Sequence, residues 1–79
     1  MYFVYIIYSA QVDRYYVGHS DDVLRRLAEH CVRKNSGATD WQLKYTESYE
    51  SRGEAMRREM EIKKKKRRSY LDQLISSAG

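Results

Sequence analysis

The pattern of apolar and polar positions predicts three short strands. Residues 2–9 are almost all aromatic or β-branched, which is typical of a strand that is central in its sheet or covered on both faces. Residues 11–14 form a polar turn, and residues 15–19 return as a second strand. Gly18 lies where the backbone must bend or approach another group closely. Residues 41–49 alternate in part between apolar and polar positions and predict a third strand.

Helical spacing follows the second strand. Ser20 is the expected N-cap, and Asp21 and Asp22 would complement the positive end of the helix dipole. Arg26 and His30 would lie about 40° apart on the flank of an apolar stripe, at the rim of the core. That stripe, at i, i+3 and i+4 spacing, consists of Val23, Leu24, Leu27, Ala28 and Cys31.

A second helix is expected after a polar loop at residues 35–40 and the third strand. Ser51 and Glu54 have the spacing of a capping box. Glu59 falls near the centre of the apolar stripe, where a carboxylate aimed at the core is costly unless another group pairs with it. Its position makes Glu59 a candidate functional residue. The stripe itself consists of Ala55, Met56, Met60 and Ile62.

The C-terminal part of the sequence predicts one more helix. After a basic run at residues 63–68, apolar residues recur at helical spacing. They are Tyr70, Leu71, Leu74, Ile75 and Ala78. The elements together predict an α/β (α+β) fold, in which about three helices flank a three-stranded antiparallel sheet. We expect a single domain over residues 1–79.

Length and charge favour a nucleic-acid partner. A chain of 79 residues buries only about 60% of its unfolded surface, so its groups would act from a shallow groove that suits a polymer. The formal net charge is +4, and residues 52–68 hold nine lysines and arginines against three glutamates. A basic patch of this kind attracts phosphate backbones.

Cysteine content and hydropathy bear on the compartment. The single cysteine, Cys31, excludes an internal disulfide and a multi-cysteine zinc site, which fits a reducing cytoplasm. No apolar run approaches the roughly 20 residues of a membrane helix, and the N-terminus lacks the layout of a signal peptide. We therefore expect a cytoplasmic protein without a membrane partner.

Four motifs in a fixed order resemble the GIY-YIG endonuclease domain, in particular its small stand-alone members, and the related N-terminal nuclease domain of the excision-repair endonuclease. They are Phe3-Val4-Tyr5, Tyr16-Val17-Gly18, Arg26 with His30, and Glu59 within Ala55 to Lys63. The first triplet departs from Gly-Ile-Tyr but keeps its tyrosine. The resemblance spans nearly the whole chain and implies a GIY-YIG-like fold.

The resemblance implies a catalytic set of Tyr5, Tyr16, Arg26, His30 and Glu59. Glu59 would hold one Mg²⁺ or Mn²⁺ ion, since a carboxylate is a hard oxygen ligand. Arg26 would stabilise charge on the phosphoryl oxygens. Tyr5 is the residue that the family assigns as general base, Tyr16 would position water or phosphate, and His30 would contact substrate or share proton transfer. Which of Tyr5, Tyr16 or a histidine accepts the proton stays open, because a phenol with a pKa near 10 needs a nearby cation.

Substrate contacts are expected from the second motif and the basic run. The residues concerned are Gly18, His19, Lys63, Lys64 and Arg67. The resemblance implies a metal-dependent endonuclease that hydrolyses DNA, selects it by structure, and acts in repair or recombination. Appended DNA-binding domains found in larger relatives have no counterpart in this sequence. Targeting would come from this domain or from a protein partner.

Other interpretations remain open at this point. The two motif tyrosines could be cross-strand packing residues, Arg26 could pair with Asp22, and Glu59 could pair with Lys63 one turn away. His30 could be a solvated residue at the helix edge. At the level of function, the alternatives are a non-catalytic nucleic-acid-binding module and a nuclease acting on RNA or single-stranded ends. The complete catalytic set favours an enzyme.

Overall fold

The computed structural model describes residues 1–32, 38–65 and 67–78. The chain order is β1 (Tyr2–Ser9), β2 (Arg14–Ser20), α1 (Val23–Val32), β3 (Gln42–Tyr49), α2 (Arg52–Lys65) and α3 (Arg68–Ala78). The strands form one antiparallel sheet in the order β2-β1-β3. The α+β architecture predicted from the sequence is therefore confirmed.

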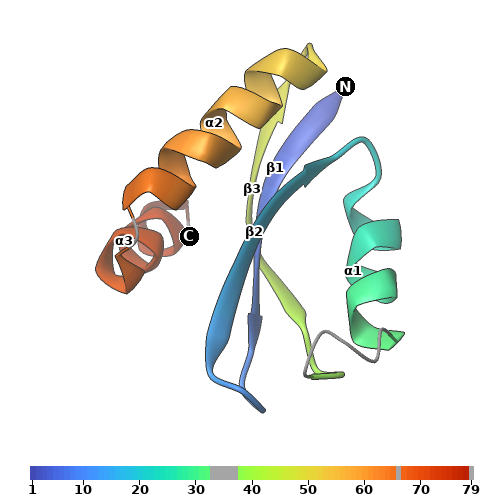
Figure 1. The fold of residues 1–79 in the computed structure, drawn as a ribbon, viewed down its shortest axis with the longest axis vertical. Helices are drawn as coiled ribbons and strands as arrows, with labels where there is room; N and C mark the ends of the chain where they lie inside the picture. Colours follow the sequence, from blue (N-terminus) through green and yellow to red (C-terminus); the bar gives the residue numbers. More distant parts are fainter. Residues whose placement is uncertain (33–37, 66, 79) are drawn as a thin grey trace.

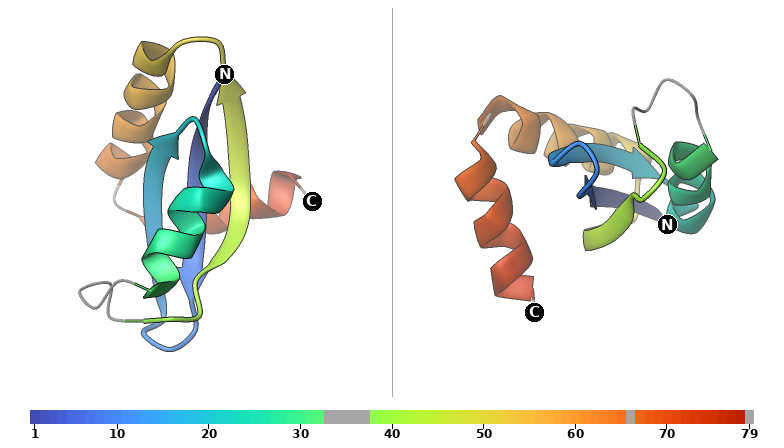
Figure 2. Two further views of the ribbon diagram at one scale, coloured as in Figure 1. Left: turned by 90° about the vertical axis from the view of Figure 1, so that its right-hand side faces the viewer. Right: turned by 90° about the horizontal axis from the view of Figure 1, so that it is seen from below.

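The helices cover both faces of the sheet. Helix α1 lies on one face, and α2 and α3 lie on the other, so the sheet forms the middle layer (Figure 1). Both side views agree with this arrangement and show β2 and β3 at the two edges (Figure 2). Within the described part of the chain, no helix has the length and apolar character needed to cross a membrane.

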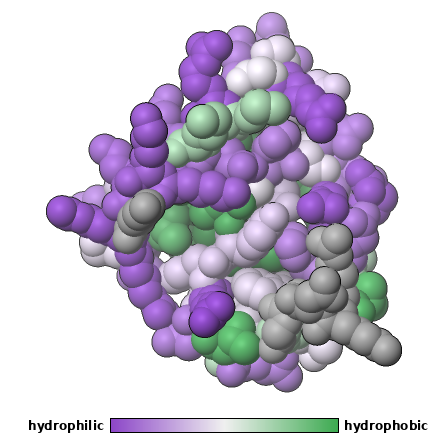
Figure 3. Space-filling model, viewed as in Figure 1, coloured by the Kyte–Doolittle hydropathy of each residue, from purple (hydrophilic) through white to green (hydrophobic). Residues whose placement is uncertain are grey.

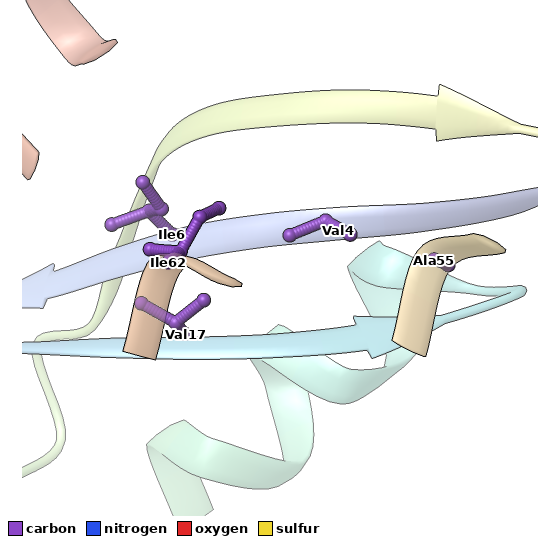
Figure 4. Close-up of a cluster of buried hydrophobic side chains, with 5 residues drawn as sticks. All are labelled: Val4, Ile6, Val17, Ala55 and Ile62. Carbon is purple, nitrogen blue, oxygen red and sulfur yellow. The ribbon is translucent and has the colours of Figure 1, made fainter. Parts of the chain in front are cut away.

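The core consists of two clusters divided by β1. On the side of α2, Val4 and Ile6 of β1 pack with Val17, Ala55 and Ile62 (Figure 4). On the side of α1, Tyr5 and Ile7 pack with Ala38 and Trp41. Because successive side chains of a strand point to opposite faces, β1 is buried on both sides, as its composition predicted.

The start of α1 differs from the prediction. Ser20 is the last residue of β2, where it pairs with Phe3, so Ser20 cannot cap the helix as predicted. Asp22 is the cap, because its Oδ1 accepts a hydrogen bond from the backbone N–H of Arg25 at 3.1 Å. Ser20 Oγ instead accepts the N–H of Asp22 at 3.0 Å.

The buried side of α1 was predicted only in part, since Val23, Leu27 and Cys31 pack against the core as expected. Leu24 is 73% exposed and Ala28 is exposed, whereas His30 is the buried residue of the helix. The face toward the sheet runs through Val23, Leu27 and His30, at i, i+4 and i+7, and Leu24 and Ala28 lie about 100° away from it. Hydropathy therefore placed Val23, Leu27 and Cys31 correctly toward the sheet, but it wrongly included Leu24 and Ala28 and missed His30.

Helix α2 shows the same effect. Ser51 caps the helix, and its Oγ accepts the N–H of Glu54 at 3.2 Å. Ala55 and Ile62 are buried as predicted, but Met56 and Met60 are exposed. The positions at i, i+4 and i+7 from Ala55 face the sheet, and Glu59 is one of them. Lys63, one turn further, begins the basic run of residues 63–68, in which residue 66 is outside the described residues.

The remaining boundaries are close to their predicted positions. Strand β1 has the predicted bounds, β2 is one residue longer at each end, and β3 begins at Gln42 rather than at Trp41. Of the loop predicted at residues 35–40, residues 38–40 belong to no helix or strand, and 35–37 lie outside the described residues. The predicted last helix is α3.

Candidate active site

Tyr5 and Gly18 form the centre of the site. They are paired across β1 and β2, and the Tyr5 side chain, which is 1% exposed, crosses directly over the glycine. A Cβ atom at position 18 would lie 2.6 Å from the Tyr5 hydroxyl oxygen and 2.8 Å from Cζ. Only glycine therefore allows the hydroxyl to reach the edge of the sheet.

Two aromatic rings lie beside Tyr5 on the face covered by α1, and Trp41 extends the cluster beyond His30. The Tyr16 ring centroid lies 6.4 Å from that of Tyr5 and 4.5 Å from that of His30. His30 also lies 6.5 Å from Tyr5 and 6.1 Å from Trp41. Tyr16 is 38% exposed, whereas His30 is buried, so Tyr16 carries this cluster to the surface. The expectation that His30 would be at the rim of the core is wrong, because these rings hold it inside.

Arg26 connects α1 to Tyr5. Its Nη1 lies 2.9 Å from Glu29 Oε2, and its guanidinium interacts with the Tyr5 hydroxyl, which raises the pKa of Arg26. Burial raises the pKa of Tyr5 above 10, although Arg26 acts in the opposite direction. The alternative ion pair between Arg26 and Asp22 is not observed among the described residues. Instead, Arg25 Nε lies 3.8 Å from Asp22 Oδ2.

Glu59 of α2 approaches β2 from the face of the sheet that lies opposite α1. Its Oε1 lies 2.8 Å from His19 Nδ1, and its Oε2 lies 3.0 Å from Lys63 Nζ. The Glu59 side chain is 15% exposed. Burial alone would raise the pKa of Glu59, but the bonds from His19 and Lys63 outweigh burial and lower it. Glu59 is therefore an ionised carboxylate, and its position toward the sheet is as predicted.

The two groups of side chains meet around the exposed edge of β2. Tyr16 and Gly18 face α1, and His19 faces α2, because alternate residues of a strand point to opposite sides. Lys63 Nζ bridges the two groups, since it lies 5.8 Å from the Tyr16 ring centroid while it contacts Glu59. The view in Figure 3, with β2 in front, shows a largely hydrophilic face in which apolar atoms form small separate groups.

Two shallow hollows adjoin this edge, and a third lies further along α2. One of about 410 Å³ is lined by His19, Arg26 and Arg52 among others, and one of about 300 Å³ is lined by Lys63 and Arg67 with Arg14. Lys64 belongs to a third hollow of about 680 Å³ at the junction of α2 and α3, which shares Arg67. Lys64 is therefore further from the centre than Lys63. Arg14 and Arg52 were not predicted as site residues from the sequence, because positive charge was the only signal that either residue carried.

Glu59 is the residue whose surroundings suit a metal ion. The described residues contain no group of three or more histidine, cysteine, aspartate or glutamate side chains that could hold one. A carboxylate offers about four lone-pair positions. His19 and Lys63 use one on each oxygen, which leaves two for a hard cation. A single carboxylate fits a weakly held ion whose other ligands come from water and substrate.

The small antiparallel sheet brings tyrosines, an arginine, a histidine and a carboxylate together around one edge, which are groups that phosphodiester hydrolysis can use. Residues 1–71 match the sequence profile of the GIY-YIG catalytic domain. The chain belongs to this nuclease family, as the motifs predicted.

Two relatives in archaea are similar over most of their length. A UPF0213 protein of Halobacterium salinarum is 43% identical over 67 residues, which cover 80% of this chain and 86% of that protein. A UPF0213 protein of Natronomonas pharaonis is 36% identical over 66 residues, covering 78% of this chain and 76% of that protein. No solved structure gives a significant match.

Proposed function

We propose that this protein is a metal-dependent endonuclease that hydrolyses phosphodiester bonds in DNA. The observation that carries the proposal is the meeting of Tyr5, Tyr16, Arg26, His30 and Glu59 around the edge of β2. These residues come from four elements, and each has the chemistry that phosphodiester hydrolysis needs. An edge strand is also open to a polymer, which a closed pocket would exclude.

Glu59 would hold one Mg²⁺ or Mn²⁺ ion through its two remaining lone pairs. A bound divalent ion polarises the phosphoryl group and lowers the pKa of water. Lys63 provides a positive charge at the same carboxylate, 3.0 Å from Oε2. When a phosphate enters, Lys63 can turn toward it, because its side chain is long and half exposed.

Arg26 would neutralise charge that develops on the non-bridging oxygens. Its contacts with Tyr5 and Glu29 orient the planar guanidinium, which lowers the entropy cost of positioning it. Tyr16 is exposed enough to meet a water molecule, and His30 supports its ring. Tyr5 would become a general base only after a cation offsets the effect of burial on its pKa. We therefore assign Tyr5 first to positioning Arg26, and Tyr16 to the water.

Substrate binding would rest on the backbone at Gly18 and on His19, Lys63, Lys64 and Arg67. Phosphate contacts carry no base identity, so selection would follow the shape of the DNA. We propose a structure-selective activity in repair or recombination, with a protein partner as a further source of targeting. We also propose that residues 1–79 act as one domain and that the protein works in the cytoplasm, where Cys31 would stay reduced.

One observation favours a second candidate. Lys63 already provides Glu59 with a cation, and a lysine that stayed in place would compete with a metal ion. The same scaffold would then be a nucleic-acid-binding module without catalysis. The two candidates differ in whether Glu59 is needed for cleavage or only for structure.

The test is cleavage of a labelled panel of duplex, single-stranded, flapped and branched DNA, and RNA, with Mg²⁺ or Mn²⁺. Wild type is compared with Glu59→Gln and Arg26→Ala. Glu61→Gln and Arg57→Ala are matched controls, because both residues lie on α2 and are exposed. We expect wild type and controls to nick DNA and both site variants to lose at least about 100-fold in rate while staying folded.

Other outcomes would separate the candidates. Binding without cleavage, unchanged by Glu59→Gln, would contradict the nuclease and indicate the binding module. Preferential cleavage of RNA or single-stranded ends would keep the chemistry and correct the substrate.

A further inference from the structure

We propose that Arg14 and Arg67 form a second phosphate-binding subsite, which holds the nucleic-acid backbone on one side of the bond that is cut. This inference rests on the proposed function and extends it. The two arginines come from different elements, because Arg14 begins β2 and Arg67 lies between α2 and α3. They line the same hollow of about 300 Å³.

The hollow has the composition of a backbone-binding groove. Its apolar floor is made by the core residues Val17 and Ile62, together with Leu71 of α3. Its rim carries Arg14, Lys63, Arg67 and Arg68, with Asp13 as the acidic residue. A firm floor with mobile cations at the rim suits a chain of phosphates better than a small molecule that must be enclosed.

The charge of the rim is unevenly neutralised. Asp13 is fully engaged, since Arg68 contacts its two carboxylate oxygens at 2.6 and 3.1 Å and the Tyr8 hydroxyl also bonds to it. Lys63 faces Glu59. Arg14 and Arg67 are exposed, and within the described ranges neither forms an ion pair with a carboxylate. Two unmatched guanidinium groups therefore face one groove.

The groove continues directly from the catalytic centre. Lys63 lines the hollow and also contacts Glu59, so a backbone bound between Arg14 and Arg67 would lead to the metal-binding carboxylate. From Arg14 to Gly18, β2 rises about 13 Å at 3.3 Å per residue. The subsite therefore lies a small number of nucleotides from the cut.

The test compares Arg14→Gln/Arg67→Gln with the control Lys44→Gln/Arg57→Gln, which removes the same charge. Both control residues are exposed, and neither lines this groove. Affinity is measured with chelator present on labelled DNA of the preferred shape, at several salt concentrations. We expect the first double variant to lose about tenfold in affinity per arginine at 0.1 M salt and to lower the salt slope by about 2. The control should stay within about threefold of wild type.

A second measurement locates the subsite. DNA with a mapped cleavage position is shortened to about two base pairs on one side or the other, while a length of about ten is kept elsewhere. Wild type should lose at least about tenfold in kcat/KM on shortening one side only, and Arg14→Gln/Arg67→Gln should be insensitive to it.

The outcomes distinguish the two proposals. Equal losses in both double variants, or unchanged sensitivity to shortening, would overturn the subsite and leave the nuclease intact. A specific loss of affinity in a protein that cleaves nothing would contradict the nuclease and retain the groove. Absence of DNA binding by wild type would overturn both.

Discussion

Two carboxylates at opposite edges of the sheet are buried to a similar extent but differ in how many hydrogen-bond acceptor positions they still have available. Glu47 on β3 accepts hydrogen bonds from Tyr45 and Tyr49 and two from Arg58, at 2.9 and 3.2 Å. These four bonds use all its lone-pair positions. Glu59, near β2, has two bonds to the described residues. The two side chains are almost equally buried, at 18% and 15% exposed.

The difference teaches how a structural carboxylate can be distinguished from one that is proposed to act in catalysis. Burial and a basic partner do not separate them, since Glu47 bonds to Arg58 and Glu59 bonds to Lys63. The number of unused lone pairs and the openness of the adjoining strand do. Four predictions follow from this contrast, in order of decreasing effect.

The largest effect concerns cleavage by matched glutamine variants. Glu59→Gln should lose at least about 100-fold in cleavage rate, because it removes the anionic ligand, whereas Glu47→Gln should stay within about threefold of wild type. Steady-state cleavage of the preferred DNA, with folding checked by circular dichroism, measures both. Comparable loss in the two variants would remove the distinction between the carboxylates.

The two glutamine variants should rank in the opposite order when their losses of unfolding free energy are compared. Glu47→Gln places an amide among donors and leaves Arg58 without its anion, which should cost about 2 kcal/mol of unfolding free energy. Glu59→Gln should cost less than about 1 kcal/mol, since Lys63 can turn to solvent. Urea unfolding gives both values, and a larger cost at Glu59 would show that it is the structural member of the pair.

Gly18 tests how closely the reactive edge is packed. In Gly18→Ala the new Cβ would collide with Tyr5, a buried side chain with no room to move, at a cost of about 1–3 kcal/mol. Cleavage should also fall by about tenfold or more as Tyr5 shifts. Gly53→Ala is the control, because nothing lies within 4 Å of that Cβ and alanine favours the helix. Thermal melts and cleavage assays should separate the two variants clearly.

The smallest effect concerns the alkaline titration of Tyr45 and Tyr49, the two tyrosines that bond to Glu47. Burial and the bonds to Glu47 raise the pKa of Tyr45 and of Tyr49 from 10.0 to about 12. Because the folded values are higher, this contribution to stability is complete below pH 10 and is lost as the pH rises toward 12. Phenolate absorbance of wild type and of Glu47→Gln should differ by two late-titrating tyrosines, whose pKa values the substitution should move toward 10. Titration of both at pH 10 in wild type would argue against the cluster.

The sequence predicted the strands better than the contacts of the site. Composition placed β1 within its observed bounds, since a strand buried on both faces has a distinctive run of residues. The helical wheel placed Glu59 toward the sheet. Hydropathy placed Val23, Leu27 and Cys31 of α1 toward the core but could not identify His30 as buried, because His30 packs among aromatic rings that come from distant positions.

The pairing of His19 with Glu59 lay beyond sequence reasoning, since it joins residues 40 positions apart through the docking of α2 on β2. The Glu47 cluster had a signal that was overlooked. Residues 45, 47 and 49 share one face of a strand, so hydrogen bonds between the Glu47 carboxylate and its neighbours on that face could have been predicted.

The antiparallel pairing of β1 with β2 has a consequence for the order of folding. A tight hairpin forms within microseconds, and it already sets Tyr5 beside Gly18 and Tyr16. Glu59 reaches this hairpin only after β3 has paired across a long stretch of chain and α2 has docked, which are slower steps. A newly made chain would thus form the aromatic part of the site long before Glu59 joins it. We expect pulsed hydrogen exchange to protect the β1–β2 amides first, and simultaneous protection of α2 would contradict this order.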